Sequence, residues 1–231
     1  LPGTDRPKPR ALAPGAFVGR AFRQLANLRM LTLLGVTFLI FFVLFGASMT
    51  YPPLLLAVRF HASALEVGLF ITGFSLVTPL VALRLAWLEA ALGMRALVLA
   101  SLLLYACAFL LFPFMPGLWW GLMPGLMLGL ARGLSLPTTM TIVQRLAPEQ
   151  DRAVFNAAYA TALRLGQTAG PAAMGLVFAA GRGLWGREAG LNAVFLTASG
   201  CSALALGGLL ALAVHVRRAQ ARNGTPAGGD S

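Results

Sequence analysis

Residues 117–143 read GLWWGLMPGLMLGLARGLSLPTTMTIV, and this stretch decides the class of fold. It is apolar for longer than the roughly 20 residues that a helix needs to cross a hydrocarbon core of about 30 Å. One charge, Arg132, lies inside it. A charge at the centre of a membrane helix costs at least ~2.5–3.5 kcal/mol on insertion scales, so such an arginine indicates a polar interior. We therefore expect a membrane helix that faces a wet, tightly packed interior.

A second apolar stretch, about residues 152–180, follows and carries Arg164. The hydrophilic segment 144–152 (QRLAPEQDR) joins the two as a hairpin. At ~1.5 Å per residue, Arg132 lies about 21 Å from the outer end of its helix and Arg164 about 18 Å from the inner start of the next. Antiparallel neighbours therefore bring both arginines into the inner half of the bilayer, near the midplane.

Polar side chains accompany both arginines at helical spacing. Arg132, Ser135 and Thr139 form one narrow stripe, and the polar residues of the next helix fall within one arc. Two such stripes on adjacent helices are what a solute pathway needs. The candidate residues that bind solute or line a cavity are Arg132, Ser135, Thr139, Asn156, Arg164 and Gln167, with Thr161 and Thr168 on the same arc. The alternative is that either arginine forms a structural salt bridge, or that Arg164 extends to the inner interface.

Glycines recur every four residues from Gly117 to Gly133, and Gly166-x-x-x-Gly170-Pro171 follows on the next helix. Glycines four apart let two membrane helices approach closely. Because the line drifts around the helix at each step, we expect it to wrap rather than form one straight seam. Pro171 beside a glycine also suits a hinge. The candidate hinge or packing residues are Gly125, Gly129, Gly133, Gly166, Gly170, Pro171 and Gly175.

The whole chain fits an all-α membrane protein with six transmembrane helices. Of its 231 residues, 58% are hydrophobic and only 11% charged, more apolar surface than a soluble domain of this size can bury. The expected spans are about 30–49, 63–85, 95–112, 118–143, 152–180 and 191–214. Ser63 and Glu66 have the spacing of a capping box, and Pro52-Pro53 is expected to mark a turn.

The distribution of basic residues predicts orientation and domain boundaries. Lys and Arg concentrate on the side that holds both termini, which places both in the cytoplasm. This gives a basic cytoplasmic linker over 1–29, a six-helix bundle over 30–215 and a polar cytoplasmic tail over 216–231. Within the linker, the apolar spacing from Phe17 to Leu28 suits either an amphipathic helix on the inner membrane surface or an unstructured tether.

Several function classes are excluded by the residues present. The net charge of +11 does not indicate nucleic-acid binding, because the basic residues sit at segment ends. His61, His215, Cys107 and Cys201 are scattered, so we expect no metal site, no cofactor and no enzyme. All seven acids lie at or outside segment ends. If the protein couples to protons, the carboxylate that relays them must come from elsewhere.

Four runs carry a family resemblance: residues 50–54 (TYPPL), 129–137 (GLARGLSLP), 147–152 (APEQDR) and 163–171 (LRLGQTAGP). With the helix spacing, they resemble the C-terminal half of a major facilitator superfamily transporter, in particular of bacterial efflux permeases. The resemblance implies half of a twelve-helix fold in a bacterial inner (plasma) membrane, whose two halves rock about a midplane site to move a small solute. The missing partner would be an N-terminal six-helix half; the first residue, Leu1, is consistent with an absent upstream part.

The loop between the second and third helices departs from the family pattern. Residues 86–95 (AWLEAALGMR) keep only Leu88, Gly93 and Arg95 of the usual Gly-x-x-x-Asp-Arg-x-Gly-Arg motif, and Glu89 is displaced by one position. The conformational latch attributed to that loop is therefore not expected here. Two alternatives stay open beside efflux by half of a transporter: a six-helix carrier acting as a homodimer, and a membrane scaffold or receptor subunit that transports nothing.

Overall fold

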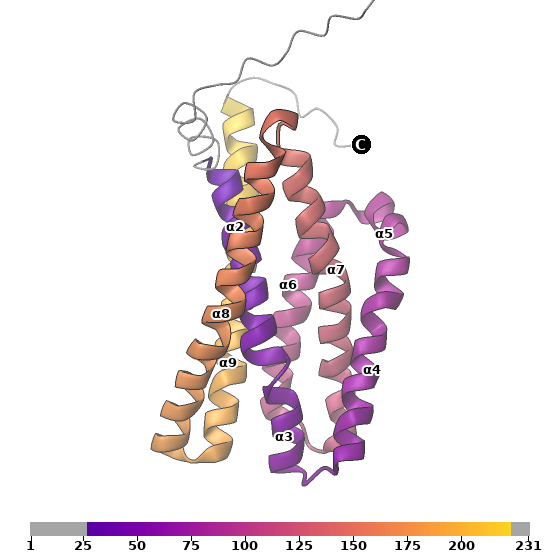
Figure 1. Cartoon of the computed structure of the whole chain (residues 1–231), viewed down its shortest axis with the longest axis vertical. Helices are drawn as coiled ribbons and strands as arrows, with labels where there is room; N and C mark the ends of the chain where they lie inside the picture. The colour runs from indigo at the N-terminus through magenta and orange to yellow at the C-terminus, as the bar shows by residue number, and fades with distance from the viewer. Residues whose placement is uncertain (1–26, 223–231) are drawn as a thin grey trace, which may run out of the picture.

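The computed structural model describes residues 27–222, and every regular element within that range is a helix (Figure 1). The long elements are α2 (Leu28–Val43), α3 (Tyr51–Arg59), α4 (Ala64–Leu83), α5 (Leu85–Leu92), α6 (Met94–Leu111), α7 (Leu122–Leu146), α8 (Arg152–Trp185) and α9 (Arg187–Arg222). Short turns are the π-helical η1 (Leu44–Ser48) and the 3₁₀ turns η2 (Phe112–Phe114), η3 (Leu118–Gly121) and η4 (Glu149–Asp151). The expected linker helix before Leu28 and the end of the tail lie outside the described residues.

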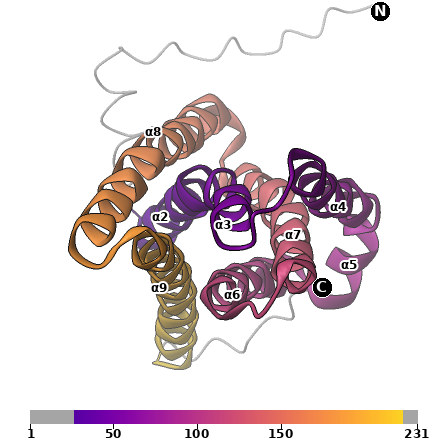
Figure 2. The ribbon, with the colours of Figure 1, turned by 90° about the horizontal axis from the view of Figure 1, so that it is seen from below.

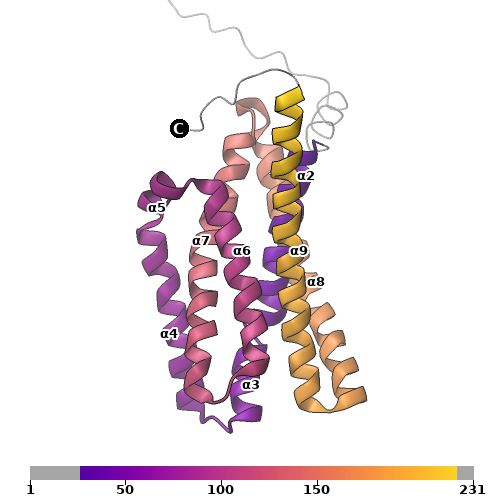
Figure 3. The same cartoon turned by 180° about the vertical axis from the view of Figure 1, so that it is seen from behind.

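The long helices run up and down in one bundle, and the two ends of the described chain lie at the same end of it (Figures 1 and 3). Seen along the bundle, α2 and α3 lie centrally, with α8 and α9 to one side and α4, α6 and α7 to the other (Figure 2). The principal contacts agree, because α7 packs on α4 and α6 whereas α8 packs on α2 and α9. The helices that carry the two arginines thus have different main neighbours.

Among the described residues, five helical segments are long and apolar enough to cross a membrane: Leu28–Arg59, Ala64–Leu83, Met94–Phe114, Leu118–Leu146 and Arg187–Val216. The expected span at about 152–180 is present as α8, a helix of 34 residues, but α8 is not among the five. Its length suffices, so its composition makes the difference. Polar residues recur along α8, whereas the corresponding stretches of the other long helices are apolar.

The interpretation of Pro52-Pro53 as a turn was wrong. The chain passes from α2 through the π-helical turn η1 into α3, and both prolines lie in the first turn of α3. A helix tolerates proline there because the first N–H groups have no intrahelical acceptor. The first span therefore extends to Arg59, well past the expected end near residue 49.

Two further local predictions have clear outcomes. The capping box is confirmed: Ser63 Oγ accepts from the Glu66 amide, while Glu66 Oε2 accepts from the Ser63 amide at 2.7 Å. The segment read as a loop at 86–95 instead contains the helix α5, which has no buried residue. One interaction that fixes it is an ion pair of 2.7 Å between Glu89 Oε1 and Arg145 Nη2 at the end of α7.

Three glycines of α7 bring this helix into close contact with α4. An added Cβ on Gly125 would lie 2.9 Å from the Phe70 ring, and one on Gly133 would lie 2.7 Å from Val81 Cβ, both on α4. Gly129 faces the same helix, and its carbonyl accepts from Thr78 Oγ1 at 3.2 Å. From Gly125 to Gly133 the glycine line therefore stays against one neighbour, because α4 follows its drift.

Candidate functional site

Arg132 lies midway along α7 with its side chain directed into the bundle. Its Nη2 donates to Ser48 Oγ at 3.4 Å, and its guanidinium carbon lies 5.5 Å from the centre of the Phe74 ring. Its Nε is buried and has no hydrogen-bond partner among the described residues. A guanidinium stacked on an aromatic face is stabilised by the ring, but an unmatched buried N–H is costly. The site therefore has an unused donor at its centre.

The groups around Arg132 supply hydroxyls rather than carboxylates. Tyr105, fully buried on α6, interacts with the guanidinium, and its hydroxyl lies 3.4 Å from Ser135 Oγ. In the described part of the chain, no salt bridge joins Arg132 to a carboxylate. An arginine keeps its charge in proteins, so Arg132 is a fixed positive charge without an ion-pair partner among the described residues.

The π-helical turn η1 delivers Ser48 to Arg132. Two glycines meet where this turn crosses α8: an added Cβ on Gly46 would lie 2.7 Å from the Gly170 carbonyl carbon. Directly after the turn, Tyr51 donates its hydroxyl to the Met174 carbonyl of α8 at 3.1 Å. Single π-helical turns inside helices often occur at functional sites. Here the turn connects the surroundings of Arg132 with the backbone of α8.

Ser135 and Thr139 extend the polar stripe along the buried side of α7. Thr139 Oγ1 donates to the Ser135 carbonyl at 2.8 Å and lies 3.3 Å from the hydroxyl of Tyr159 on α8. Because Thr139 has already used its proton, Tyr159 is the donor in that second contact. The stripe on α7 thus reaches α8 through a tyrosine, not through Arg164.

The polar arc of α8 lies on the exposed side of the bundle. Asn156, Thr161, Arg164 and Thr168 are exposed, and Gln167 is half-buried. The structure therefore does not bring Arg164 to the interior side of Arg132. On the other side of α8, Gly166 and Gly170 lie against the backbone of α2 and η1, whereas Gly175 has open space around it. Pro171, inside α8, is exposed.

Arg59 makes several contacts at the end of the bundle that lies away from the two ends of the described chain. Arg59, at the end of α3, donates to the Pro113 carbonyl at 2.8 Å and to Asn192 Oδ1 at 2.9 Å. Its Nε lies 3.6 Å from Glu188 Oε1. This one side chain joins α3 to the turn after α6 and to the start of α9.

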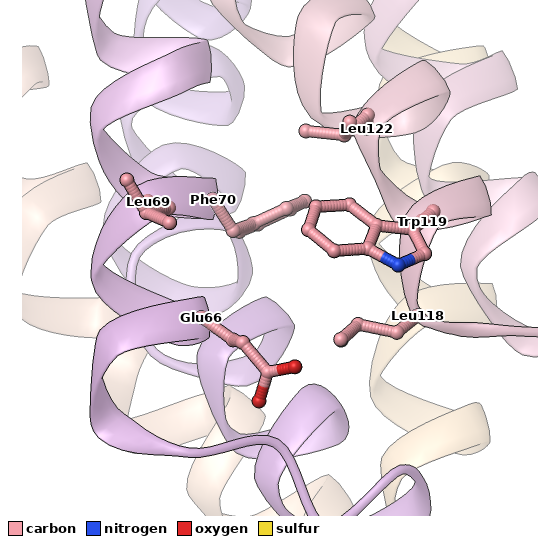
Figure 4. Close-up of a pocket in the computed structure, with 6 residues that line it drawn as sticks. All are labelled: Glu66, Leu69, Phe70, Leu118, Trp119 and Leu122. Carbon is pink, nitrogen blue, oxygen red and sulfur yellow. The ribbon is translucent and has the colours of Figure 1, made fainter.

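A small hollow of about 150 Å³ lies at the same end of the bundle, between α4 and the start of α7 (Figure 4).

Sequence reasoning missed the partners of Arg132. Ser48, Phe74 and Tyr105 lie in apolar segments, where a serine or an aromatic residue is an ordinary packing residue. It also missed Tyr159, the partner of Thr139, which lies on the buried side of α8. A usable signal existed only for the tyrosines, whose hydroxyls need partners when the ring is buried.

The apolar spans, together with an interior cation that has no carboxylate partner within residues 27–222, define a multi-pass helical membrane protein. The chain belongs to the major facilitator superfamily, whose sequence model matches residues 33–230. It is accordingly a membrane transporter of that superfamily and not an enzyme. No curated protein and no solved structure gives a significant match.

Proposed function

We propose that the chain is the C-terminal half of a secondary transporter that exports a small organic solute across a bacterial inner membrane by alternating access. Both termini lie in the cytoplasm in this proposal, and protons drive export. Carboxylates of a second six-helix bundle relay those protons, because among the described residues no acid lies in the middle of a long helix; Glu89 lies on the short helix α5. The family match supports transport itself; direction, coupling and solute class are the proposal.

One observation carries the proposal: Arg132 is inside the bundle without a carboxylate among the described residues. Its Nε remains available to an acceptor. An anionic group of the solute, or a carboxylate of the second bundle, completes this site. Ser135 and Thr139 extend the polar stripe from Arg132 toward the C-terminal end of α7, and Tyr105 is a further contact of Ser135.

The polar residues on the exposed side of α8 support the proposal that a second bundle packs there. Asn156, Arg164 and Thr168 lie there on a helix too polar to rank among the five apolar spans. Facing lipid, Arg164 alone would cost at least ~2.5–3.5 kcal/mol near the bilayer centre. In the proposal this side faces the solute pathway, with Arg164, Gln167 and Asn156 on its wall and Gly170-Pro171 as the hinge.

The test is the replacement of Arg132 in the complete transporter, assayed in cells that lack their own efflux pumps. Retention of carboxyfluorescein, an anionic dye, is compared with retention of ethidium, a cation. We expect Arg132→Ala to abolish export at an unchanged level of membrane insertion, and Arg132→Lys to retain part of it. Arg182→Ala, which removes an exposed charge at the end of α8, is the matched control and should export normally.

Normal export by Arg132→Ala would reduce Arg132 to a packing residue and refute its role. Water access gives a second check, because cysteines placed at Ser135 or Gln167 should react with water-soluble thiol reagents if they line a pathway. Unreactive cysteines at both positions would favour a membrane scaffold or receptor subunit. Sizing of the chain alone in detergent separates the two possible partners, since a stable dimer that moves solute would replace the second bundle by a second copy.

A further inference from the structure

A small hollow between the first turn of α4 and the start of α7 has no role in the transport proposal. Its lining combines one carboxylate with apolar and aromatic side chains: Glu66, Leu69, Phe70, Leu118, Trp119 and Leu122. Figure 4 shows Glu66 and Trp119 reaching into the space between the two helices from opposite sides, with Phe70 beside the indole ring. The volume, about 150 Å³, is below that of a drug-sized site and suits a single compact group.

Glu66 keeps binding capacity after it has capped its helix. Both hydrogen bonds that it accepts, from the Ser63 amide at 2.7 Å and the Ser63 hydroxyl at 2.8 Å, go to Oε2. Its Oε1 accepts none from the described residues, and no cation in that range pairs with it. Glu66 as a whole residue is partly buried, but its carboxylate is open to solvent, so a cation can reach it freely and their attraction is screened by water and salt.

The aromatic side of the hollow favours the same charge. Phe70 is 5% exposed and forms the buried side of the hollow, whereas Trp119 is 66% exposed and forms its outer side. Aromatic faces attract an organic cation, and tryptophan does so most strongly. A carboxylate and aromatic rings in one niche match an alkylammonium group, whose charge meets Glu66 and whose carbon atoms meet Leu69 and Leu122.

We infer that this hollow binds an ammonium group, primary or quaternary, carried either by a free small amine or by the headgroup of a phospholipid. Both sources are accessible, since Leu69 and Trp119 are exposed at a helix end, and tryptophan is enriched at membrane interfaces. The inference is independent of the proposed transport of an anionic solute, because Arg132 and its surroundings take no part in it.

The experiment uses Trp119 as a reporter in the full chain in uncharged detergent. With Trp87, Trp120 and Trp185 changed to Phe, Trp119 is the sole tryptophan, because the chain has four. Titration with tetramethylammonium chloride, against sodium chloride of equal ionic strength, should give a saturable fluorescence change. The matched control retains Trp120, which is 63% exposed but outside the lining, and replaces Trp119; it should give none.

Glu66→Gln in the single-Trp119 protein removes the charge while preserving the capping box, since Gln also serves at that position. We expect Kd to rise roughly two- to fivefold, the range of a solvent-exposed ion pair. Ser63→Ala breaks the cap but leaves the charge, so it should bind nearly as well. An unsaturable response, or an equal Kd in Glu66→Gln, overturns the inference.

Nanodiscs distinguish the two sources. If a headgroup occupies the hollow, the apparent Kd for tetramethylammonium is higher in discs that contain phosphatidylethanolamine than in discs of phosphatidylglycerol alone, and Glu66→Gln removes the difference. An equal Kd in both discs, still weakened by Glu66→Gln, assigns the site to free amines. Absence of saturable binding in phosphatidylglycerol discs contradicts both.

Discussion

Gly170 and Gly175 are five residues apart on α8, yet their surroundings predict opposite responses to the same substitution. A Cβ on Gly170 would lie 3.1 Å from the Gly46 amide nitrogen and within 3.1 Å of the Phe42 carbonyl carbon, whereas one on Gly175 would meet nothing within 4 Å. Backbone atoms cannot move aside as a side chain can. We expect Gly170→Ala to destabilise the protein by about 1–3 kcal/mol.

The control substitution, Gly175→Ala, should be neutral or stabilise the helix by up to about 1 kcal/mol, because alanine is the better helix former. Thermal unfolding in detergent, followed with a dye that reacts with Cys107 and Cys201 as they become accessible, measures both. Equal unfolding temperatures for the two variants would mean that the α2–α8 crossing is looser than described. A rise for Gly175→Ala would also show that this glycine is no packing residue.

At the same scale, the helical period is enough to predict which α7 residues share a stripe. Ser135 and Thr139 are buried and Arg132 points inward beside them. The period cannot predict what the polar arc of α8 faces, because that depends on which helix packs on its other side. Gly166 and Gly170 match the α2 backbone, so α2, not α7, is the main neighbour of α8.

Between elements, α7 and α8 are joined by a hydrogen bond whose strength can be measured. The hydroxyls of Thr139 and Tyr159 lie 3.3 Å apart in a buried position. A double-mutant cycle of Thr139→Val and Tyr159→Phe should give a coupling of about 0.6 kcal/mol, the average for side-chain hydrogen bonds between membrane helices. Reversible unfolding in mixed micelles measures it.

The cycle needs a reference pair that is not in contact. Thr168 donates to the Arg164 carbonyl within its own helix at 3.0 Å and is exposed, so Thr139→Val with Thr168→Val should be additive. A coupling of zero between Thr139 and Tyr159 would mean that α7 and α8 are held only by the apolar cluster around Val143 and Phe155.

Helix existence was predictable from the sequence for a simple physical reason: each apolar run is long enough to span lipid and must satisfy its own backbone hydrogen bonds. The positions of the helix ends were less predictable from the sequence. Pro52-Pro53 reads as a break in sequence but begins α3, and α9 starts at Arg187, before its apolar run. Nothing in the composition signalled the π-helical turn at Leu44–Ser48, which lies against α8 at Gly46.

For the whole molecule, the number of times the chain crosses the membrane decides on which side of the membrane α9 ends. In the part of the chain that the structure describes, five segments are apolar enough to cross, and α8 is a further long helix. Arg145 and Arg152 flank the hairpin before α8, which favours the cytoplasm there by the positive-inside rule. If α8 crosses against a polar partner, Arg187 lies outside and Arg218 inside. If α8 instead lies on the inner membrane surface, Arg187 lies inside and Arg218 outside.

Single cysteines at Ser63, Glu149, Arg187 and Arg218, in a protein with Cys107 and Cys201 changed to Ala, distinguish the two topologies. A membrane-impermeant maleimide applied to intact cells should label the Ser63 and Arg187 positions, and permeabilised cells should label all four. Labelling at Ser63 and Arg218 instead would place α8 on the membrane surface. The six-crossing result is expected because the bundle packs α8 side by side with α2 and α9, both of which belong to apolar spans. Against these neighbours α8 can cross the bilayer with its glycine side covered, which leaves only its polar side to be shielded by the rest of the transporter.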